Sequence, residues 1–244
     1  MSTRVLHIVA TPRGLSSNTG RISSVLLEEL HDRYDLAVST LDLFSADLPA
    51  VAGVNIKSKY ALMTGQPLDD PARSSWSEIE KTIERFLDAD VYLLTVPMWN
   101  FSIPYALKYY IDAIVQPGYL FTYDERGQPQ GMVYGKKMVC VTSRGADYSA
   151  PQLASLDYLQ SYLQTIFGFV GITDLKFFNV QPMDISQESR KAAFKAAISE
   201  VRSWVANGAW DLAPTGQAEA LPADIKPQVI VDESDSPPDA VGQR

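Results

Sequence analysis

The stretch Val91-Tyr-Leu-Leu-Thr-Val-Pro-Met-Trp-Asn-Phe-Ser-Ile-Pro104 decides the fold. Residues 91–96 are apolar at nearly every position and predict the strongest strand of the chain, whereas residues 97–104 form an aromatic and polar loop. The next segment repeats apolar residues at i, i+3, i+4 and i+7, the spacing of a helix with one buried face: Leu107, Tyr110, Ile111 and Ile114. A strand without polar alternation has both faces covered, which is typical of a parallel sheet between two layers of helices.

The same order of strand, loop and helix recurs along the chain. Further strands are predicted at residues 5–10, 37–41, 138–142 and 175–180, and helices around 22–30, 76–87, 153–167 and 188–205. Residues 120–123 and 131–134 flank an Asp-Glu-Arg-Gly turn and predict a hairpin inserted before the fourth principal strand. A polar, proline-containing excursion as far as Pro71 is expected to pack outside the sheet. The pattern predicts a three-layer, doubly wound α/β domain.

Composition limits the function. The chain has 244 residues, 46% of them hydrophobic, and a net charge of -8 without any Lys/Arg-rich run, which argues against a nucleic-acid partner. No run of eighteen apolar residues and no cleavable leader is present, so we expect no membrane association and a cytoplasmic location. Cys140, the single cysteine, lies in an apolar strand and is expected to be a buried thiol. No metal-ligand spacing or Ser/His/Asp arrangement is found, and His7 and His31 look structural.

The composition changes near Asp211. Residues 1–210 are expected to form the domain, and residues 211–244 an acidic tail rich in Pro and Ala, with seven acidic and two basic residues. Its one apolar run, residues 229–231, fits an added strand or a clip in a partner's groove, although the composition favours a flexible tail.

The first strand ends in a loop, Thr11 to Thr19, that is dense in hydroxyls and amides. It contains neither the spaced glycines of a dinucleotide fingerprint nor a Walker lysine. Side chains of Thr11, Ser17, Asn18 and Thr19, with the N–H groups at a helix start, predict a pocket for a single phosphate. The alternative is an ordinary helix cap, which explains one of these residues but not the cluster.

The loop after residues 91–96 offers a flat apolar ligand a wall and a polar edge. The expected contacts come from Pro97, Met98, Trp99, Asn100 and Phe101. Exposed aromatic side chains gain burial when such a ring covers them, while an amide bonds its polar edge. The alternative is that the aromatic residues are core residues at a turn.

A third loop, Ser143 to Tyr148, supplies a hydroxyl, a cation and a glycine: Ser143, Arg144 and Gly145, followed by Ala146. Arg144 fits either a role in stabilising negative charge on a bound ring or a surface salt bridge. Because ligands of such sheets bind beyond the carboxyl ends of the strands, the three loops are expected to meet in one crevice.

These residues together resemble a family, the FMN-dependent NADH:quinone oxidoreductases or azoreductases of the flavodoxin-like fold. The resemblance runs over about residues 4 to 205 in the family's order, through Thr11 with Ser17-Asn-Thr, Pro97-Met-Trp-Asn-Phe101, Gly118 with Phe121-Thr-Tyr, Ser143-Arg-Gly and Gly168-Phe-Val-Gly-Ile-Thr-Asp174. It implies a flavodoxin-like fold that binds FMN through the three loops. It also implies a homodimer, with substrate-binding aromatic residues at Phe121, Phe169 and Tyr148.

The implied activity is a ping-pong hydride transfer from NADH or NADPH to a quinone or azo compound through flavin N5, with no catalytic side chain assigned. The sequence departs from the family at Trp99, where tyrosine is usual, at Ala146, where a second glycine is usual, and at Thr11-Pro-Arg13, where serines are usual. Two alternatives stay open: an FMN electron carrier of flavodoxin type, and a family member repurposed to bind or reduce a specialised metabolite.

Overall fold

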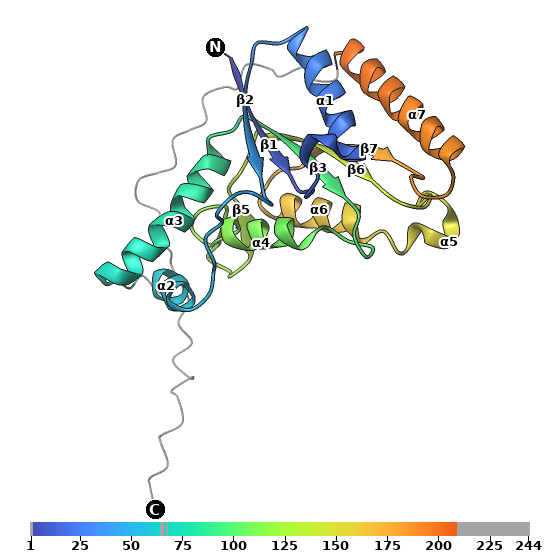
Figure 1. Cartoon of the computed structure of the whole chain (residues 1–244). Coiled ribbons are helices and arrows are strands. Elements are labelled where there is room, and N and C mark those ends of the chain that lie inside the picture. Colours follow the sequence, from blue (N-terminus) through green and yellow to red (C-terminus); the bar gives the residue numbers. More distant parts are fainter. Residues whose placement is uncertain (1, 64–65, 67, 209–244) are drawn as a thin grey trace, which may run out of the picture.

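A computed structural model shows a five-stranded parallel sheet in the order β2-β1-β3-β6-β7 (Figure 1). Residues 2–63, 66 and 68–208 are described. The strands are β1 (Thr3–Val9), β2 (Leu36–Asp42), β3 (Val91–Pro97), β6 (Lys137–Ser143) and β7 (Asp174–Val180). Because β1, β3 and β6 are parallel, the loops that follow them open on the same edge of the sheet, and the strand order reverses between β1 and β3.

Alternate residues of each central strand enter two separate cores. Leu94 of β3 packs in a core with α3 (Asp70–Leu87), α4 (Tyr105–Ile114) and α6 (Tyr158–Phe169). The neighbouring Leu93 packs in the other core with α1 (Asn18–His31) and α7 (Gln187–Ala206). Helices therefore cover both faces, and the predicted three-layer, doubly wound α/β fold is confirmed.

Three expectations about elements need correction. The expected long helix at 153–167 is two helices, α5 (Pro151–Ala154) and α6, because Asp157 caps a new start by accepting hydrogen bonds from the N–H groups of Leu159 and Gln160. The excursion before Pro71 contains a helix, α2 (Val54–Met63), whose sequence has almost no helical amphipathicity. In the inserted hairpin, β4 (Phe121–Tyr123) pairs with β5 (Pro129–Gly131), so the second strand comes earlier than expected.

Two further expectations concern the ends of the fold and its relation to membranes. The expected tail, residues 211–244, lies outside the described residues. Within the described ranges, no helix combines the length and the apolar character that a membrane span requires.

Candidate functional site

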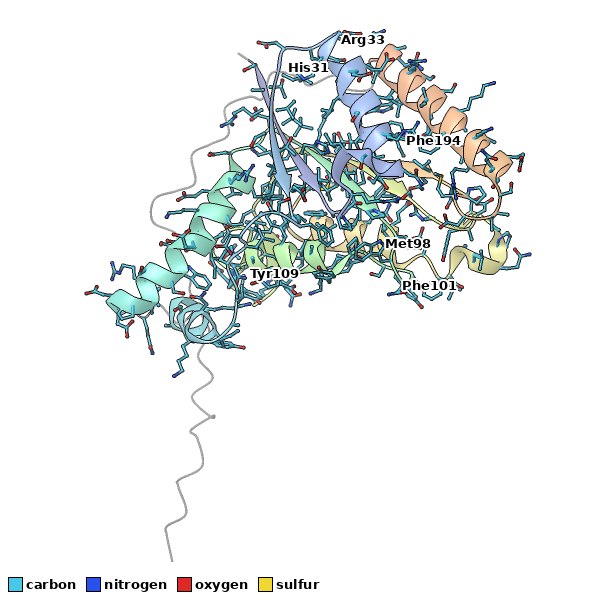
Figure 2. All side chains as sticks on the ribbon, viewed as in Figure 1. His31, Arg33, Met98, Phe101, Tyr109 and Phe194 are labelled. Atoms are coloured by element: carbon cyan, nitrogen blue, oxygen red, sulfur yellow. The ribbon has the colours of Figure 1, made fainter. Side chains whose placement is uncertain are left out.

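Ser143, the last residue of β6, joins the three loops. Its hydroxyl lies 2.7 Å from the Thr19 hydroxyl at the start of α1, and its carbonyl oxygen accepts a 2.8 Å hydrogen bond from the Met98 N–H after β3. Figure 2 places Met98 and Phe101 together at this end of the molecule, far from His31 at the opposite end of α1. The structure thus brings together the three loops that the sequence singled out.

The first loop ends in a buried group of hydroxyls, some of whose protons have no acceptor among the described residues. Ser17 caps α1 by accepting a 3.0 Å hydrogen bond from the Gly20 N–H, which leaves the Ser17 hydroxyl proton without an acceptor in the described part of the chain. One proton of the Thr19 and Ser143 hydroxyl pair bonds within the pair, and the other has no acceptor among the described residues. Thr11, Ser17 and Thr19 are all buried. An anion at the positive end of the α1 dipole would accept these protons, so these residues fit a phosphate.

Gly20 allows this loop to lie against α1. A Cβ at Gly20 would come within 2.6 Å of the Leu15 Cα and 2.7 Å of the Gly14 carbonyl oxygen, both backbone atoms that cannot rotate away. The expected phosphate loop therefore depends on this glycine.

We expect Gly20→Ala to displace the 3-10 turn Gly14–Ser16 and weaken FMN binding by roughly tenfold or more, which fluorescence titration measures. Gly168→Ala is the matched control, because no atom lies within 4 Å of a Cβ at Gly168 in α6. There the change should stabilise the helix by about 0.5 to 1 kcal/mol and leave FMN affinity unchanged. Equal effects of the two changes would contradict this role of Gly20.

The second loop contains a tight turn in a strained backbone conformation. Trp99 and Ser102 exchange backbone hydrogen bonds of 2.9 and 3.0 Å across Asn100 and Phe101, whose φ angles are +47° and +70°. Two positive φ values mark a type I′ turn, which favours Asn-Gly, so Phe101 adopts a conformation that is unfavourable for a bulky side chain. Strain of this kind, about 1 to 3 kcal/mol per residue, clusters at ligand sites.

The aromatic side chains of this loop differ in exposure. Trp99 is half-buried, with its ring 5.7 Å from Phe44 and 6.3 Å from Tyr105, so its packing agrees in part with the core alternative. Phe101 is 46% exposed and lies 6.5 Å from the ring of Tyr148. Phe101 is therefore the aromatic residue of this loop that a flat ligand would cover.

Arg144 of the third loop forms a buried ion pair. Its side chain has no exposed surface, and its Nε donates a 2.9 Å hydrogen bond to the Asp157 carboxylate, while its Nη1 donates to Thr142 and Asn179. Burial lowers the pKa of the guanidinium from its ordinary value, and the Asp157 carboxylate opposes that shift. The pair is a salt bridge, as one alternative expected, but it is buried rather than on the surface. A contact of Arg144 with a cofactor stays a prediction.

Sequence reasoning missed Asp157 because the expected helix ran through it. Its carboxylate bonds both Arg144 and the first N–H groups of α6. An acidic residue just before a run of helical spacing is a start signal that could have identified it. Gly145 and Ala146 are half-buried beside the segment at Asp184, whose N–H donates a 2.9 Å hydrogen bond to the Gly145 carbonyl oxygen.

Two of the expected substrate residues lie together near the hairpin. The rings of Phe121 and Phe169 are 4.8 Å apart, and Phe121 also contacts Tyr123. Phe121 is 9% exposed and Phe169 36%, so Phe169 is the one with a free face. Tyr148 lies at the second loop instead, next to Phe101.

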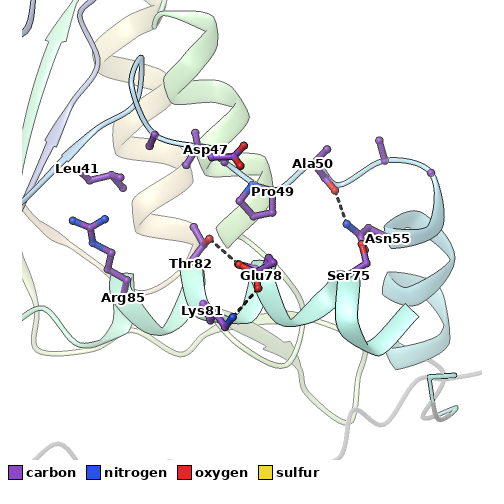
Figure 3. A pocket seen from close by; sticks show the side chains of 14 residues that line it. Leu41, Asp47, Pro49, Ala50, Asn55, Ser75, Glu78, Lys81, Thr82 and Arg85 are labelled. Carbon is purple, nitrogen blue, oxygen red and sulfur yellow. Dashed lines mark hydrogen bonds and ion pairs between the residues drawn. The ribbon is translucent and has the colours of Figure 1, made fainter. Parts of the chain in front are cut away.

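A cavity lies elsewhere on the molecule. It has a volume of about 910 Å³ between α3, α2 and the 46–53 segment, and Figure 3 shows Glu78, Lys81 and Arg85 of α3 along one side. None of its described lining residues comes from the three loops. Within the described ranges, no group of His, Cys, Asp or Glu side chains could hold a metal ion. Cys140 is buried as expected, and burial raises the pKa of its thiol.

Comparison with known proteins gives a consistent result. A family profile described as flavodoxin-like fold matches residues 3–205. The FMN-dependent NADH:quinone oxidoreductase of Desulfotalea psychrophila is 34% identical over 202 residues, which cover 82% of this chain and 95% of that protein. The FMN-dependent NADH:quinone oxidoreductase 3 of Pseudomonas fluorescens is 34% identical over 203 residues, which cover 80% of this chain and 94% of that protein.

Solved structures agree on the fold. An azoreductase from Bacillus anthracis superposes with a TM-score of 0.76 at 24% sequence identity, covering 84% of this chain and 99% of that one. An FMN-dependent NADH-azoreductase from the same species, solved in complex with FMN, gives a TM-score of 0.75 at 22% identity, covering 84% and 98%. At these identities the likeness concerns the arrangement of the chain.

Proposed function

This chain belongs to the family of FMN-dependent NADH:quinone oxidoreductases, and from that membership we propose that it is an FMN-dependent enzyme that takes electrons from NADH or NADPH and reduces quinones or azo compounds. The observation that carries the proposal is that the three loops meet at Ser143, with buried hydroxyls on one side and a turn with an exposed aromatic ring on the other. Bound FMN would supply the hydride-transfer chemistry between the nicotinamide and the acceptor, so no side chain is needed for that step.

The side chains of this protein would bind and orient FMN. Ser17 and one hydroxyl of the Thr19–Ser143 pair would donate protons to the FMN phosphate, with Thr11 and Asn18 closing the same pocket. Met98, Trp99 and Phe101 would form the apolar wall of the ring, and Asn100 with the loop N–H groups would bond its polar edge. Pro97 and the backbone from Ser143 to Ala146 would complete the ring's surroundings.

We propose a homodimer in which the aromatic pair of Phe121 and Phe169 supplies a substrate wall to the partner's site, and in which Tyr148 contacts substrate beside Phe101. The exposed face of Phe169 supports this arrangement, since an exposed aromatic ring gains burial at an interface. We also propose a cytoplasmic location, where NADH is available.

Purification of the full chain tests the proposal. We expect a yellow protein whose visible absorbance is bleached by NADH or NADPH without oxygen and restored by a quinone or an azo dye. Bleaching by the nucleotide in the absence of acceptor, followed by recovery when the acceptor is added after the nucleotide has been removed, would identify the ping-pong order. A protein that binds FMN but resists both nucleotides is an electron carrier, and a colourless protein that does not take up added FMN overturns the proposal.

A further inference from the structure

A chain of buried polar groups runs beneath the first loop and is not explained by the proposed binding contacts. His7 Nε2 lies 2.7 Å from the Thr95 hydroxyl, which lies 2.6 Å from the Ser23 hydroxyl, and Ser23 donates a 3.3 Å hydrogen bond to the Thr19 carbonyl oxygen. His7, Thr95 and Ser23 have no exposed surface. They come from β1, β3 and α1, so the chain connects the centre of the sheet with the first turn of the helix.

The direction of these hydrogen bonds follows from their last acceptor. A carbonyl oxygen only accepts, so the Ser23 proton bonds Thr19, and Thr95 then donates its own proton to Ser23. His7 must therefore donate from Nε2, which leaves Nδ1 as a bare acceptor. Nδ1 has no partner among the described residues, and a buried unpaired acceptor costs less than a buried unpaired N–H group.

This series of buried hydrogen bonds ends at the proposed phosphate pocket. The Thr19 carbonyl and the Gly20 N–H belong to one peptide group, and this N–H donates to the Ser17 hydroxyl, the cap of α1. A hydrogen bond accepted by the carbonyl polarises the peptide and strengthens the N–H as a donor. The Ser17 hydroxyl is thereby held as an acceptor from Gly20, with its own proton free for a ligand.

We propose that His7, Thr95 and Ser23 are positioning residues that fix the first turn of α1 and direct the Ser17 hydroxyl proton toward the cofactor phosphate. This inference rests on the proposed function, because it assigns the phosphate to FMN. The three residues have no exposed surface, so they would act on the phosphate through Thr19, Gly20 and Ser17.

Binding of FMN and of riboflavin, which lacks the phosphate, separates positioning from general loss of structure. We expect Ser23→Ala and Thr95→Val to weaken FMN binding by about 3- to 10-fold while riboflavin binding stays within about twofold, and Thr95→Ser to restore FMN affinity. Ser24→Ala is the matched control. The Ser24 hydroxyl donates to the Gly20 carbonyl with the same four-residue spacing on α1 as Ser23 to Thr19, but it is not part of the hydrogen-bonded series from His7 to Thr19. Parallel loss of both ligands, or no loss of either, overturns the positioning role.

A nitrogen-15 NMR measurement on the full chain without ligand tests the bond directions independently. The protein has two histidines, so in the His31→Gln variant the only imidazole signals come from His7. We expect the tautomer protonated at Nε2, and a tautomer protonated at Nδ1 would overturn the inference. If the wild-type protein binds neither flavin, the proposed function fails; if it binds FMN and Ser23→Ala keeps the wild-type ratio of the two affinities, only the positioning role fails.

Discussion

Replacing Asp157 with alanine is expected to destabilise the protein by about 3 to 5 kcal/mol, because the change leaves the Arg144 charge buried without a carboxylate. The same change removes the cap of α6, since the Asp157 carboxylate also accepts hydrogen bonds from Leu159 and Gln160. Urea denaturation at neutral pH measures the free energy of unfolding of the variant and the wild type.

Two controls separate the charge from the cap. Asp69→Ala removes the cap of α3, where the carboxylate accepts from Ala72 and no buried arginine depends on it, so about 1 kcal/mol is expected. Arg144→Met combined with Asp157→Leu removes both charges and should recover most of the stability lost in Asp157→Ala. An Asp157→Ala variant no less stable than Asp69→Ala would show that the ion pair contributes nothing.

The sequence predicts the layers well because each strand is buried on both faces. Residues 91–96 show no alternation of polar and apolar positions, and the structure places Leu93 and Leu94 in different cores. The carboxyl ends of such strands share one edge, so convergence of the three loops follows from topology alone. Phe101 was singled out as an aromatic residue in a polar loop, and its exposure agrees with that reading.

The parts that were missed depend on contacts between residues far apart in the sequence. Arg144 after a buried strand looks the same in sequence whether its side chain faces a ligand or a carboxylate, and only the fold places Asp157 against it. The α2 helix was not predicted because its sequence lacks a distinct apolar face. His7 looked structural, yet its partner Thr95 lies 88 residues away and joins it only through the pairing of β1 with β3.

His7 also makes stability depend on pH, because burial lowers its pKa to about 4. An unfolded histidine titrates near 6.5, so between these values the unfolded chain binds a proton that the folded protein does not, and stability is lost as the pH falls. The sign follows from the depressed folded pKa: the contribution is complete above about pH 6.5 and lost as the pH approaches 4. From pH 7 to pH 5 this residue alone should remove about 2 kcal/mol from the free energy of unfolding.

Urea denaturation at pH 7 and pH 5 measures this loss, and His7→Gln isolates it, since the amide does not titrate in this range. Carboxylates elsewhere contribute equally to the wild type and the variant. The free energy of unfolding should therefore fall by about 2 kcal/mol more in the wild type than in His7→Gln between pH 7 and pH 5. Identical pH dependence in the wild type and His7→Gln would mean that His7 binds a proton as readily in the folded protein as in the unfolded chain. The protonated ring would then need an acceptor for its Nδ1 proton, and the hydrogen bonds of the described residues supply none.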